Sequence, residues 1–250
     1  MELGEQIRAR TRTVPEDWSW DVEMGSRQRE SQNGDRGRVN ERTLVVDFDG
    51  TITEQDLLDE IALTFGDEDV YREVDEGLDD RSLTLHEVIR REFEPVRAPL
   101  GEVQEWVLEN VRVRPGFSEV VQLARERGWR FVVVSSGFRE LIEPVLEREG
   151  LSDVELLSNT VDPDPDGWRV QFRVSETCEV CGQPCKRSTA AALADGTELV
   201  YVGDGYSDRC AAELADLVFA RRGLASYLEE QGVPFERFDD FHSIARRLAS

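Results

Sequence analysis

Three short apolar runs punctuate the sequence. Residues 43–46, 131–134 and 199–202 are almost wholly apolar and rich in β-branched side chains. Because runs of this kind are hydrophobic on both faces, they indicate strands buried in a parallel sheet with helices on each side. We expect these runs to form the three best-defined strands of the fold.

Helix-like periodicity fills much of the sequence between and after these runs. Alternation of strands and helices predicts an α/β fold, with a Rossmann-like core of three layers in which helices cover both faces of a parallel sheet. Residues 154–174 are expected to form two more strands around a strong turn signal at 162–167. The expected helices cover residues 117–127, 138–149, 187–194, 207–214, 223–231 and 240–249.

Residues 53–113 interrupt the alternation. They carry helical patterning without a convincing strand, and they follow the first strand directly. This placement predicts a helical cap inserted over the first strand. The catalytic core would then comprise residues 42–52 and 114–250.

The first 41 residues differ from the rest of the chain. They lack sustained periodicity and are rich in Arg, Glu, Ser, Gln and Gly, a composition that predicts a disordered N-terminal tail over residues 1–41. A start codon placed too early gives the same pattern, and Met24 is an alternative start. Trp18 and Trp20 leave room for a docking segment.

Composition narrows the classes of partner. The net charge is −23, from 53 acidic and 30 basic residues, and such a surface repels nucleic acid and anionic membranes at long range. A local site with positive charge can still attract a small anion. No apolar run approaches the roughly 20 residues that a membrane helix needs, and the N-terminus lacks the apolar region of a secretory signal. We therefore expect a cytoplasmic protein with neither nucleic acid nor membrane as partner.

Two aspartates directly follow the first strand. Residues two apart on an extended chain project to the same side, so Asp47 and Asp49 can face one site. Carboxylates this close repel unless one is protonated or a cation lies between them, and Mg²⁺ suits both carboxylates and a phosphate oxygen. Gly50 lets the backbone turn and present amides to an anion. Alone, the segment also fits a simple Asp-Gly turn.

The other two strands also end in polar residues. Ser135, followed by Ser136 and Gly137, can donate hydrogen bonds to a phosphate, although an ordinary helix cap has the same sequence. Asp204 and Asp208 could complete the ligand set of the metal, while Asp208 also fits the first turn of a helix. Ligands of open α/β sheets bind outside the carboxyl ends of the strands, so all these residues should meet at one edge.

A single lysine, Lys186, occurs among the 30 basic residues. It lies between the second and third strands, where a phosphate site at the sheet edge would need a cation. A compact ammonium can neutralise a carboxylate and a phosphate together. This position favours a site residue over a solvated surface lysine.

Taken in order, these motifs resemble the haloacid dehalogenase superfamily of phosphohydrolases over roughly residues 43–250. The resemblance implies that Asp47 attacks phosphorus and forms an aspartyl-phosphate. Asp49 protonates the leaving oxygen and then activates the water that hydrolyses the intermediate. The expected activity is that of a Mg²⁺-dependent phosphomonoesterase acting on a small-molecule phosphate ester.

The resemblance also implies how the ligands are held. Mg²⁺ would be bound by Asp47, the backbone carbonyl of Asp49, and Asp204, with Asp208 nearby. Ser135 and Lys186 would bind the transferring phosphoryl oxygens, helped by Ser136 and Gly137. The metal residues expected are Asp47, Asp49, Asp204 and Asp208.

The substrate is expected to depend on the cap. The helical insert resembles the subfamily that includes phosphoserine phosphatase, whose members bind the amino group with a Glu and the carboxylate with an Arg. Alignment places Asp56 at the Glu position, a departure from the pattern, and Arg90 near the Arg position. Arg90 with Arg91 also fits a solvated basic pair.

The C-terminal half is similar to one branch of the family. Its Cys-rich stretch before Lys186 and its Phe-rich end resemble the methionine-salvage phosphatase acting on 2-hydroxy-3-keto-5-methylthiopentenyl-1-phosphate. Phosphoserine or another small phosphate ester is the alternative substrate. A phosphotransferase and a non-enzymatic phospho-ligand binding module are the alternative functions, and Asp49 and Lys186 argue against the binding module. The oligomeric state stays open.

Three cysteines fall within eight residues. Cys178, Cys181 and Cys185 have part of the spacing of a zinc site, which needs four ligands when it is structural. Cys210 could approach from the helix expected over residues 207–214. Reduced structural thiols and a redox sensor are the alternatives, and a cytosolic location argues against stable disulfides.

Overall fold

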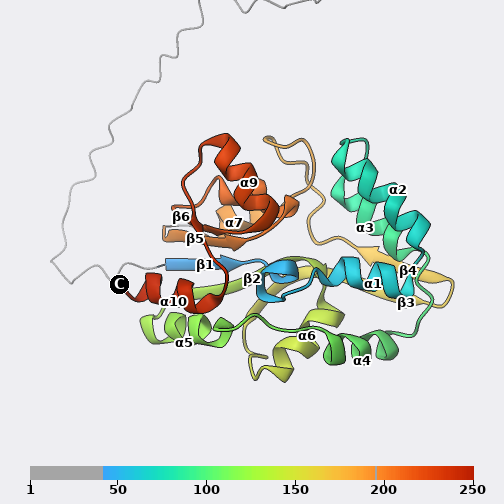
Figure 1. Ribbon diagram of the computed structural model, residues 1–250, viewed down its shortest axis with the longest axis horizontal. Helices are drawn as coiled ribbons and strands as arrows, with labels where there is room; N and C mark the ends of the chain where they lie inside the picture. Colours follow the sequence, from blue (N-terminus) through green and yellow to red (C-terminus); the bar gives the residue numbers. More distant parts are fainter. Residues whose placement is uncertain (1–41, 195) are drawn as a thin grey trace, which may run out of the picture. The chain divides into compact units, whose positions relative to one another are not determined.

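A seven-stranded sheet forms the middle layer of the fold (Figure 1). The computed structural model describes residues 42–194 and 196–250; the tail predicted over residues 1–41 lies outside the described residues. The strand order is β4-β3-β2-β1-β5-β6-β7, and neighbours run parallel except for the antiparallel pair β3 and β4. The strands are β1 (Arg42–Val46), β2 (Arg130–Phe138), β3 (Glu155–Asp164), β4 (Gly167–Gln171), β5 (Glu198–Gly203), β6 (Leu217–Ala220) and β7 (Glu236–Arg237).

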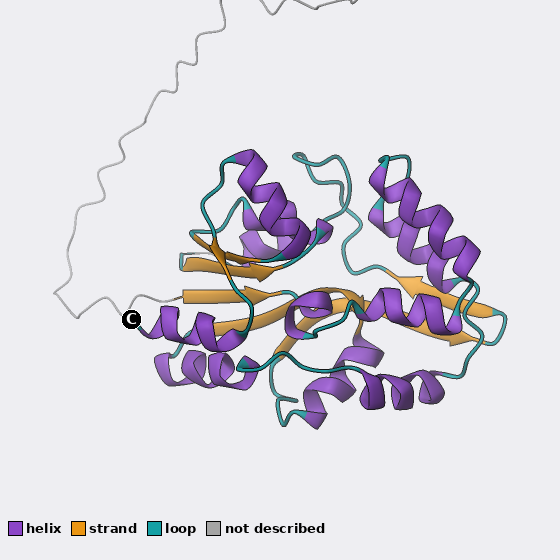
Figure 2. Ribbon diagram, in the orientation of Figure 1, coloured by secondary structure: helices purple, strands orange, loops and turns teal. Residues whose placement is uncertain are grey.

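Helices cover both faces of the sheet (Figure 2). Leu44 and Val46 of β1 pack into one hydrophobic core, and Val45 packs into the other, as the alternation of side chains along a strand requires. The first core includes α4 (Leu100–Asn110), α5 (Phe117–Arg127), α6 (Arg139–Arg148) and α10 (Phe241–Ala249). The second includes α7 (Arg187–Leu193), α8 (Arg209–Ala212) and α9 (Arg222–Gln231). The predicted three-layer α/β architecture is therefore confirmed.

Four α-helices, α1 to α4, form the segment of residues 53–113 that was predicted to be an insertion. An isolated bridge between Thr53 and Val113 joins the two ends of this segment. Helix α2 packs against α3, α3 contacts β4, and α4 packs against α6 beneath the sheet (Figure 1). The division into cap and core stays a prediction, since α4 shares the helical layer of α6. The other three helices are α1 (Leu57–Phe65), α2 (Glu68–Asp79) and α3 (Leu85–Phe93).

Most of the predicted elements are present, two of them differ in extent or type, and two strands were not predicted. Strand β2 does not end at residue 134 but continues to Phe138. The helix expected over 207–214 is a 3₁₀ turn, η2 (Tyr206–Asp208), followed by the short α8. Strands β6 and β7 were not predicted, because each is too short to show a clear alternation. In the part of the chain that the structure describes, no helix combines the length and the apolar character needed to cross a bilayer.

Candidate active site

The turn after β1 places two carboxylates side by side. Asp47 continues the parallel pairing, since its amide donates to the carbonyl of Val202 (2.9 Å). The chain then turns sharply at Gly50, whose φ is +71°. A Cβ on Gly50 would overlap Oδ2 of Asp204, so glycine is needed both for the turn and for the close approach of the loop after β5. Asp47 and Asp49 are both buried.

Ser135 connects the end of β2 with the first turn. Its hydroxyl donates to Oδ2 of Asp49 (2.8 Å) and accepts the amide of Gly137 (2.7 Å). A Cβ on Gly137 would lie 2.8 Å from the same Asp49 oxygen, so a small residue is required here as well. Ser136 lines the cavity in front of the carboxylates. The predicted serine-glycine segment therefore meets Asp49 in space.

Lys186 lies at the centre of the group. Its Nζ donates to Oδ1 of Asp47 and to Oδ1 of Asp208 (2.8 Å), and all three side chains are buried. Burial disfavours the charged amine, but the attraction of Asp208 and Asp47 outweighs it and raises the pKa of Lys186. An ammonium has three donors, so one remains for a further acceptor.

Asp208 accepts four hydrogen bonds from its surroundings. Its Oδ1 accepts from Lys186 and from the hydroxyl of Tyr201 (2.8 Å), and its Oδ2 accepts the amides of Asp204 and Gly205 (3.0 Å each). Its side chain is fully buried. These four donors fix Asp208 beside Lys186 and the loop of Asp204, and its predicted role as a metal ligand stays a prediction.

Burial and neighbouring negative charges raise the pKa values of the other three carboxylates, those of Asp47, Asp49 and Asp204. Burial, with the charge of Asp208, raises the pKa of Asp47, and the same two causes raise the pKa of Asp204 to about 6. Burial and the charge of Asp56 raise the pKa of Asp49 to about 7. Oδ1 of Asp49 is buried without a hydrogen-bond partner. We call Asp47, Asp49, Lys186, Asp204 and Asp208 the strand-end cluster.

This cluster fits a divalent cation. One oxygen from each of Asp47, Asp204 and Asp208 lies within 4.8 Å of the others, and buried like charges at this separation favour a cation between them. The hydroxyl of Thr51 donates to Oδ1 of Asp204 (2.9 Å). The guanidinium of Arg222 forms an ion pair with Oδ2 of Asp204 (3.5 Å). The oxygen-only donor set is the type that Mg²⁺ prefers.

A cavity of about 200 Å³ opens in front of the cluster. Its lining also includes four carboxylates of helices α1 to α3 and of the residue that caps α1, which we call the acidic wall: Asp56, Asp59, Asp75 and Glu92. Burial and neighbouring carboxylates raise the pKa of Asp59 to about 7 and that of Glu92 to about 8. Asp56 also caps α1, accepting the amides of Leu58 (3.1 Å) and Asp59 (3.4 Å).

Arg90, predicted to bind substrate, lies elsewhere. Its side chain is exposed and its guanidinium lies 5.3 Å from the centre of the Phe172 ring. It does not line the cavity. The residues of α3 that do are Leu85, Val88, Ile89 and Glu92. The structure therefore does not bring Arg90 to the site. The three cysteines predicted as zinc ligands do not line this cavity. They lie together with Cys210 at another place in the structure.

Two residues of the site were missed from the sequence. The buried guanidinium of Arg114 donates to the carbonyls of Gly50 (3.1 Å), Thr51 (2.9 Å) and Thr53 (3.0 Å), and so holds the first turn in place. Tyr201 anchors Asp208 as described above. A tyrosine on a fully buried strand needs a partner for its hydroxyl, and this need could have identified Tyr201 from the sequence. No feature of the sequence pointed to Arg114.

The chain is similar to known phosphatases. A family model described as haloacid dehalogenase-like hydrolase matches residues 44–213. A polyol phosphate phosphatase of Saccharomyces cerevisiae is 30% identical, over 80% of this chain and 90% of that protein. A 2-hydroxy-3-keto-5-methylthiopentenyl-1-phosphate phosphatase of Brevibacillus brevis is 29% identical, over 82% of this chain and 94% of that protein.

Solved structures support the same fold. A phosphoserine phosphatase, solved as a phospho-aspartyl intermediate analogue, has a TM-score of 0.64 at 21% identity and covers 83% of this chain and 99% of that chain. A second phosphoserine phosphatase, with substrate bound, has a TM-score of 0.63 at 20% identity and covers 83% and 98% of the respective chains. The chain belongs to the haloacid dehalogenase-like hydrolase family and is a phosphatase of that family.

Proposed function

We propose that this phosphatase hydrolyses small-molecule phosphate monoesters with Asp47 as nucleophile and Mg²⁺ as cofactor. The observation that carries the proposal is the position of Asp47: it is buried at the cavity, contacts the only lysine of the chain, and has Asp49 two residues away. A purely structural carboxylate would not need an acid of raised pKa beside it. A small-molecule ester is also the partner that the volume of the cavity favours.

The cation would be held by the carboxylates of Asp47 and Asp204 and by the backbone carbonyl of Asp49. Mg²⁺ bound there supplies positive charge that offsets the repulsion among these carboxylates and polarises the phosphoryl group. The raised pKa values of Asp47 and Asp204 support this assignment, because burial and the charge of Asp208 raise both and a bound cation would offset these effects. Asp208 positions Lys186 and the loop of Asp204.

The two aspartates divide the chemistry. In the first step a carboxylate oxygen of Asp47 forms a bond to phosphorus, and the bond from phosphorus to the leaving oxygen breaks while Asp49 gives that oxygen a proton. In the second step Asp49 takes a proton from water, whose oxygen attacks phosphorus and releases phosphate from Asp47. A pKa of about 7 lets Asp49 carry and return a proton near neutral pH.

Lys186 is suited to the phosphoryl oxygens. Two of its donors hold Asp47 and Asp208, and the third can donate to an oxygen whose charge grows in the transition state. Ser135 orients Asp49 through a 2.8 Å hydrogen bond. Its binding to phosphate, with that of Ser136 and the amide of Gly137, stays a prediction.

The acidic wall suggests what kind of alcohol leaves. Among the described residues that line the cavity, none is Arg, Lys or His. Carboxyl groups on this wall can exchange hydrogen bonds with hydroxyl or amino groups and would repel a carboxylate. We therefore infer a leaving group without negative charge. Polyol phosphates and 2-hydroxy-3-keto-5-methylthiopentenyl-1-phosphate meet this condition; phosphoserine, which carries a carboxylate, does not.

Phosphate release from a panel of esters tests the proposal. Activity should require Mg²⁺, stop with EDTA, and return when Mg²⁺ is restored. Asp47→Asn should lower kcat by roughly 10⁴-fold or more, as expected for a nucleophile, whereas Asp166→Asn, on an exposed turn, should leave it unchanged. Activity that survives both EDTA and Asp47→Asn would refute the mechanism.

The same panel tests the leaving group. Esters of neutral polyols should have higher kcat/KM than phosphoserine. Faster turnover of phosphoserine would contradict the inference from the acidic wall while leaving the roles of the strand-end cluster intact. Assays with an added acceptor alcohol separate hydrolysis from transfer, because a phosphotransferase would form a new ester in place of inorganic phosphate.

A further inference from the structure

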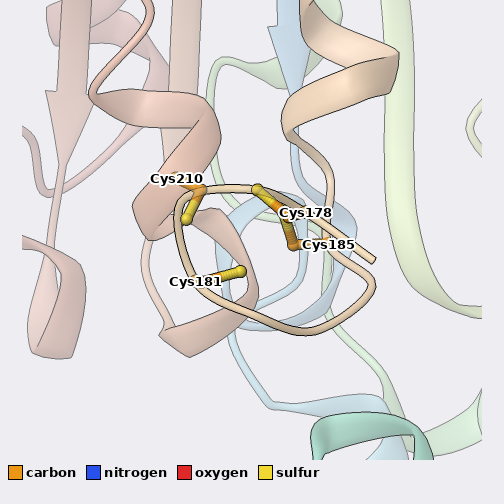
Figure 3. A group of neighbouring side chains, drawn as sticks. All are labelled: Cys178, Cys181, Cys185 and Cys210. Carbon is orange, nitrogen blue, oxygen red and sulfur yellow. The ribbon is translucent and has the colours of Figure 1, made fainter. Parts of the chain in front are cut away.

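All four cysteines of the chain meet outside the catalytic cavity (Figure 3). Cys178, Cys181 and Cys185 lie in the loop between β4 and α7, and Cys210 lies on α8, which follows β5 and η2. The sulfurs are all within 4.8 Å of one another, and none forms a disulfide. Two segments separated in sequence thus bring four thiols to one point.

The geometry matches a tetrahedral thiolate site. Zn²⁺ binds four cysteine sulfurs at about 2.3 Å in a tetrahedron, which places the sulfurs about 3.8 Å apart. The spacing of two and three residues between the loop cysteines is within the range of structural zinc sites. A disulfide would need a sulfur pair at about 2.05 Å.

The backbone of the loop is arranged around the sulfurs. The amide of Val180 donates to Sγ of Cys178 (3.4 Å), and the amide of Gly182 donates to the carbonyl of Cys178 (2.9 Å). Gly182 has a φ of +74°, which favours glycine and closes the turn directly after Cys181. An amide directed at a sulfur stabilises the thiolate form that a metal requires.

Apolar packing does not explain the cluster. Cys181 is exposed, Cys178 and Cys185 are half-buried, and Val180 is 56% exposed. The chain from residue 172 to 186 forms no regular helix or strand. A loop with so little buried apolar surface gains little from the hydrophobic effect, so its hydrogen bonds must hold it, and a metal bound by the four thiols would add to them.

We propose that Cys178, Cys181, Cys185 and Cys210 bind one Zn²⁺ in a closed, structural site. Binding displaces four thiol protons and forms four Zn–S bonds, with no change in oxidation state. All four positions of the ion are filled by protein, so the site has no open position for a substrate. The ion cross-links the loop before α7 to the helix that follows the Asp204–Asp208 segment.

This cross-link has a consequence for Lys186, the residue directly after Cys185. Arg187, the next residue, donates to the carbonyl of Cys210 (2.7 Å) and strengthens the same junction. Zn²⁺ therefore positions the lysine against Asp47 and Asp208. This consequence depends on the proposed function; the metal site does not.

Metal analysis of the full-length protein tests the site. Protein produced with zinc in the medium and purified without chelator should contain about one Zn²⁺ per chain. Replacement by Co²⁺ should give thiolate-to-cobalt charge-transfer bands and the visible bands of tetrahedral cobalt. A zinc content no higher than that of Cys181→Ser, or fewer than four titratable thiols in the unfolded, unreduced protein, would overturn the proposal.

Variants separate this site from the catalytic cation. Cys181→Ser, at the most exposed ligand, should reduce zinc retention against a chelator at least about tenfold, and Cys181→His should restore it. Val180→Ser changes the same loop without removing a ligand and should retain zinc. Asp204→Asn should lose the Mg²⁺-dependent activity of the proposed function but keep its zinc. Zinc lost from Asp204→Asn and kept by Cys181→Ser would place the ion at the wrong site and refute the proposal.

Activity gives a separate measurement. Cys181→Ser should lower kcat by about 10- to 100-fold through displacement of Lys186. If zinc is lost and kcat is unchanged, the metal site stands and the link to Lys186 is refuted. If no variant or wild-type protein releases phosphate, the proposed function fails while the zinc content still decides the site.

Discussion

The two sides of the catalytic cavity hold their carboxylates in opposite ways. In the strand-end cluster, Asp47 and Asp208 share Lys186, and Asp204 accepts from Thr51. On the acidic wall, burial and neighbouring carboxylates raise the pKa of Asp59 to about 7 and that of Glu92 to about 8. Carboxylates thus lie beside an ammonium and a hydroxyl donor on one side and mainly beside other carboxylates on the other.

This difference separates two tasks. Paired carboxylates have fixed positions and can align a reacting phosphoryl group. Carboxyl groups that keep a proton can both donate and accept hydrogen bonds, which suits contact with hydroxyl groups of a leaving alcohol. The strand-end cluster would therefore determine the reaction, and the acidic wall would determine the substrate. The following experiments test that separation, from the largest expected effect to the smallest.

Lys186→Met should have the largest effect. We expect kcat/KM to fall by about 10²- to 10³-fold, because a donor to the transition state is lost. The free energy of unfolding should fall by about 3–5 kcal/mol, since Asp47 and Asp208 remain buried without their cation. Chemical denaturation and steady-state kinetics measure the two effects. Wild-type stability in Lys186→Met would mean that the two carboxylates are not held by this pairing.

Gly50→Ala should disturb the cluster through sterics alone. The added Cβ would overlap Oδ2 of Asp204 at a φ of +71°, so we expect kcat to fall by about 10²-fold and more Mg²⁺ to be needed for half-maximal rate. Gly101→Ala is the matched control, since a Cβ there meets nothing within 4 Å; it should keep full activity. Equal rates in the two variants would contradict the assigned contact.

Glu92→Gln tests the protonated wall through pH. The folded-state pKa of about 8 lies above the ordinary 4.5, so the folded protein binds more protons than the unfolded chain between these values. Stability should then decrease as pH rises from 4.5 to 8, by at most about 1.4 kcal/mol per pH unit for this group. Glu92→Gln should flatten the decrease in thermal melts, whereas Glu94→Gln, exposed nearby, should not. Parallel curves for all three proteins would refute the buried, protonated state of Glu92.

Arg90→Ala should have the smallest effect. Because the side chain lies over Phe172 and away from the cavity, kcat/KM should stay within about twofold of wild type. Loss of the exposed cation–π contact should lower the free energy of unfolding by about 0.5–1 kcal/mol. A tenfold rise in KM would restore Arg90 as a substrate residue.

The positions of the strand-end cluster could be predicted because each depends on local sequence. A buried apolar run identifies a strand, and polar residues at its carboxyl end lie at one edge of the sheet. Asp47 and Asp204 directly follow β1 and β5, and Ser135 follows the apolar run of β2. Lys186 lies on no strand, but its uniqueness among 30 basic residues pointed to the same edge.

Other features depend on how the helices pack and were not predictable. Arg90 and Glu92 are two residues apart on α3, and only the orientation of the helix decides which of them faces the cavity. Arg114 binds backbone carbonyls, which leave no trace in side-chain patterns. Cys210 is 25 residues beyond Cys185, so its approach requires the tertiary fold. A cytoplasmic location stays a prediction.

Arg114 and the Thr53–Val113 bridge close the base of the helical insertion. Where the ends of a segment are already joined, doubling its length costs only about 0.6 kcal/mol of closure entropy. The insertion can therefore be lengthened, shortened or exchanged as one unit while the turn after β1 keeps its shape. In evolution, and equally in the design of chimaeras, a family built in this way can acquire new substrates by replacing one contiguous stretch of gene.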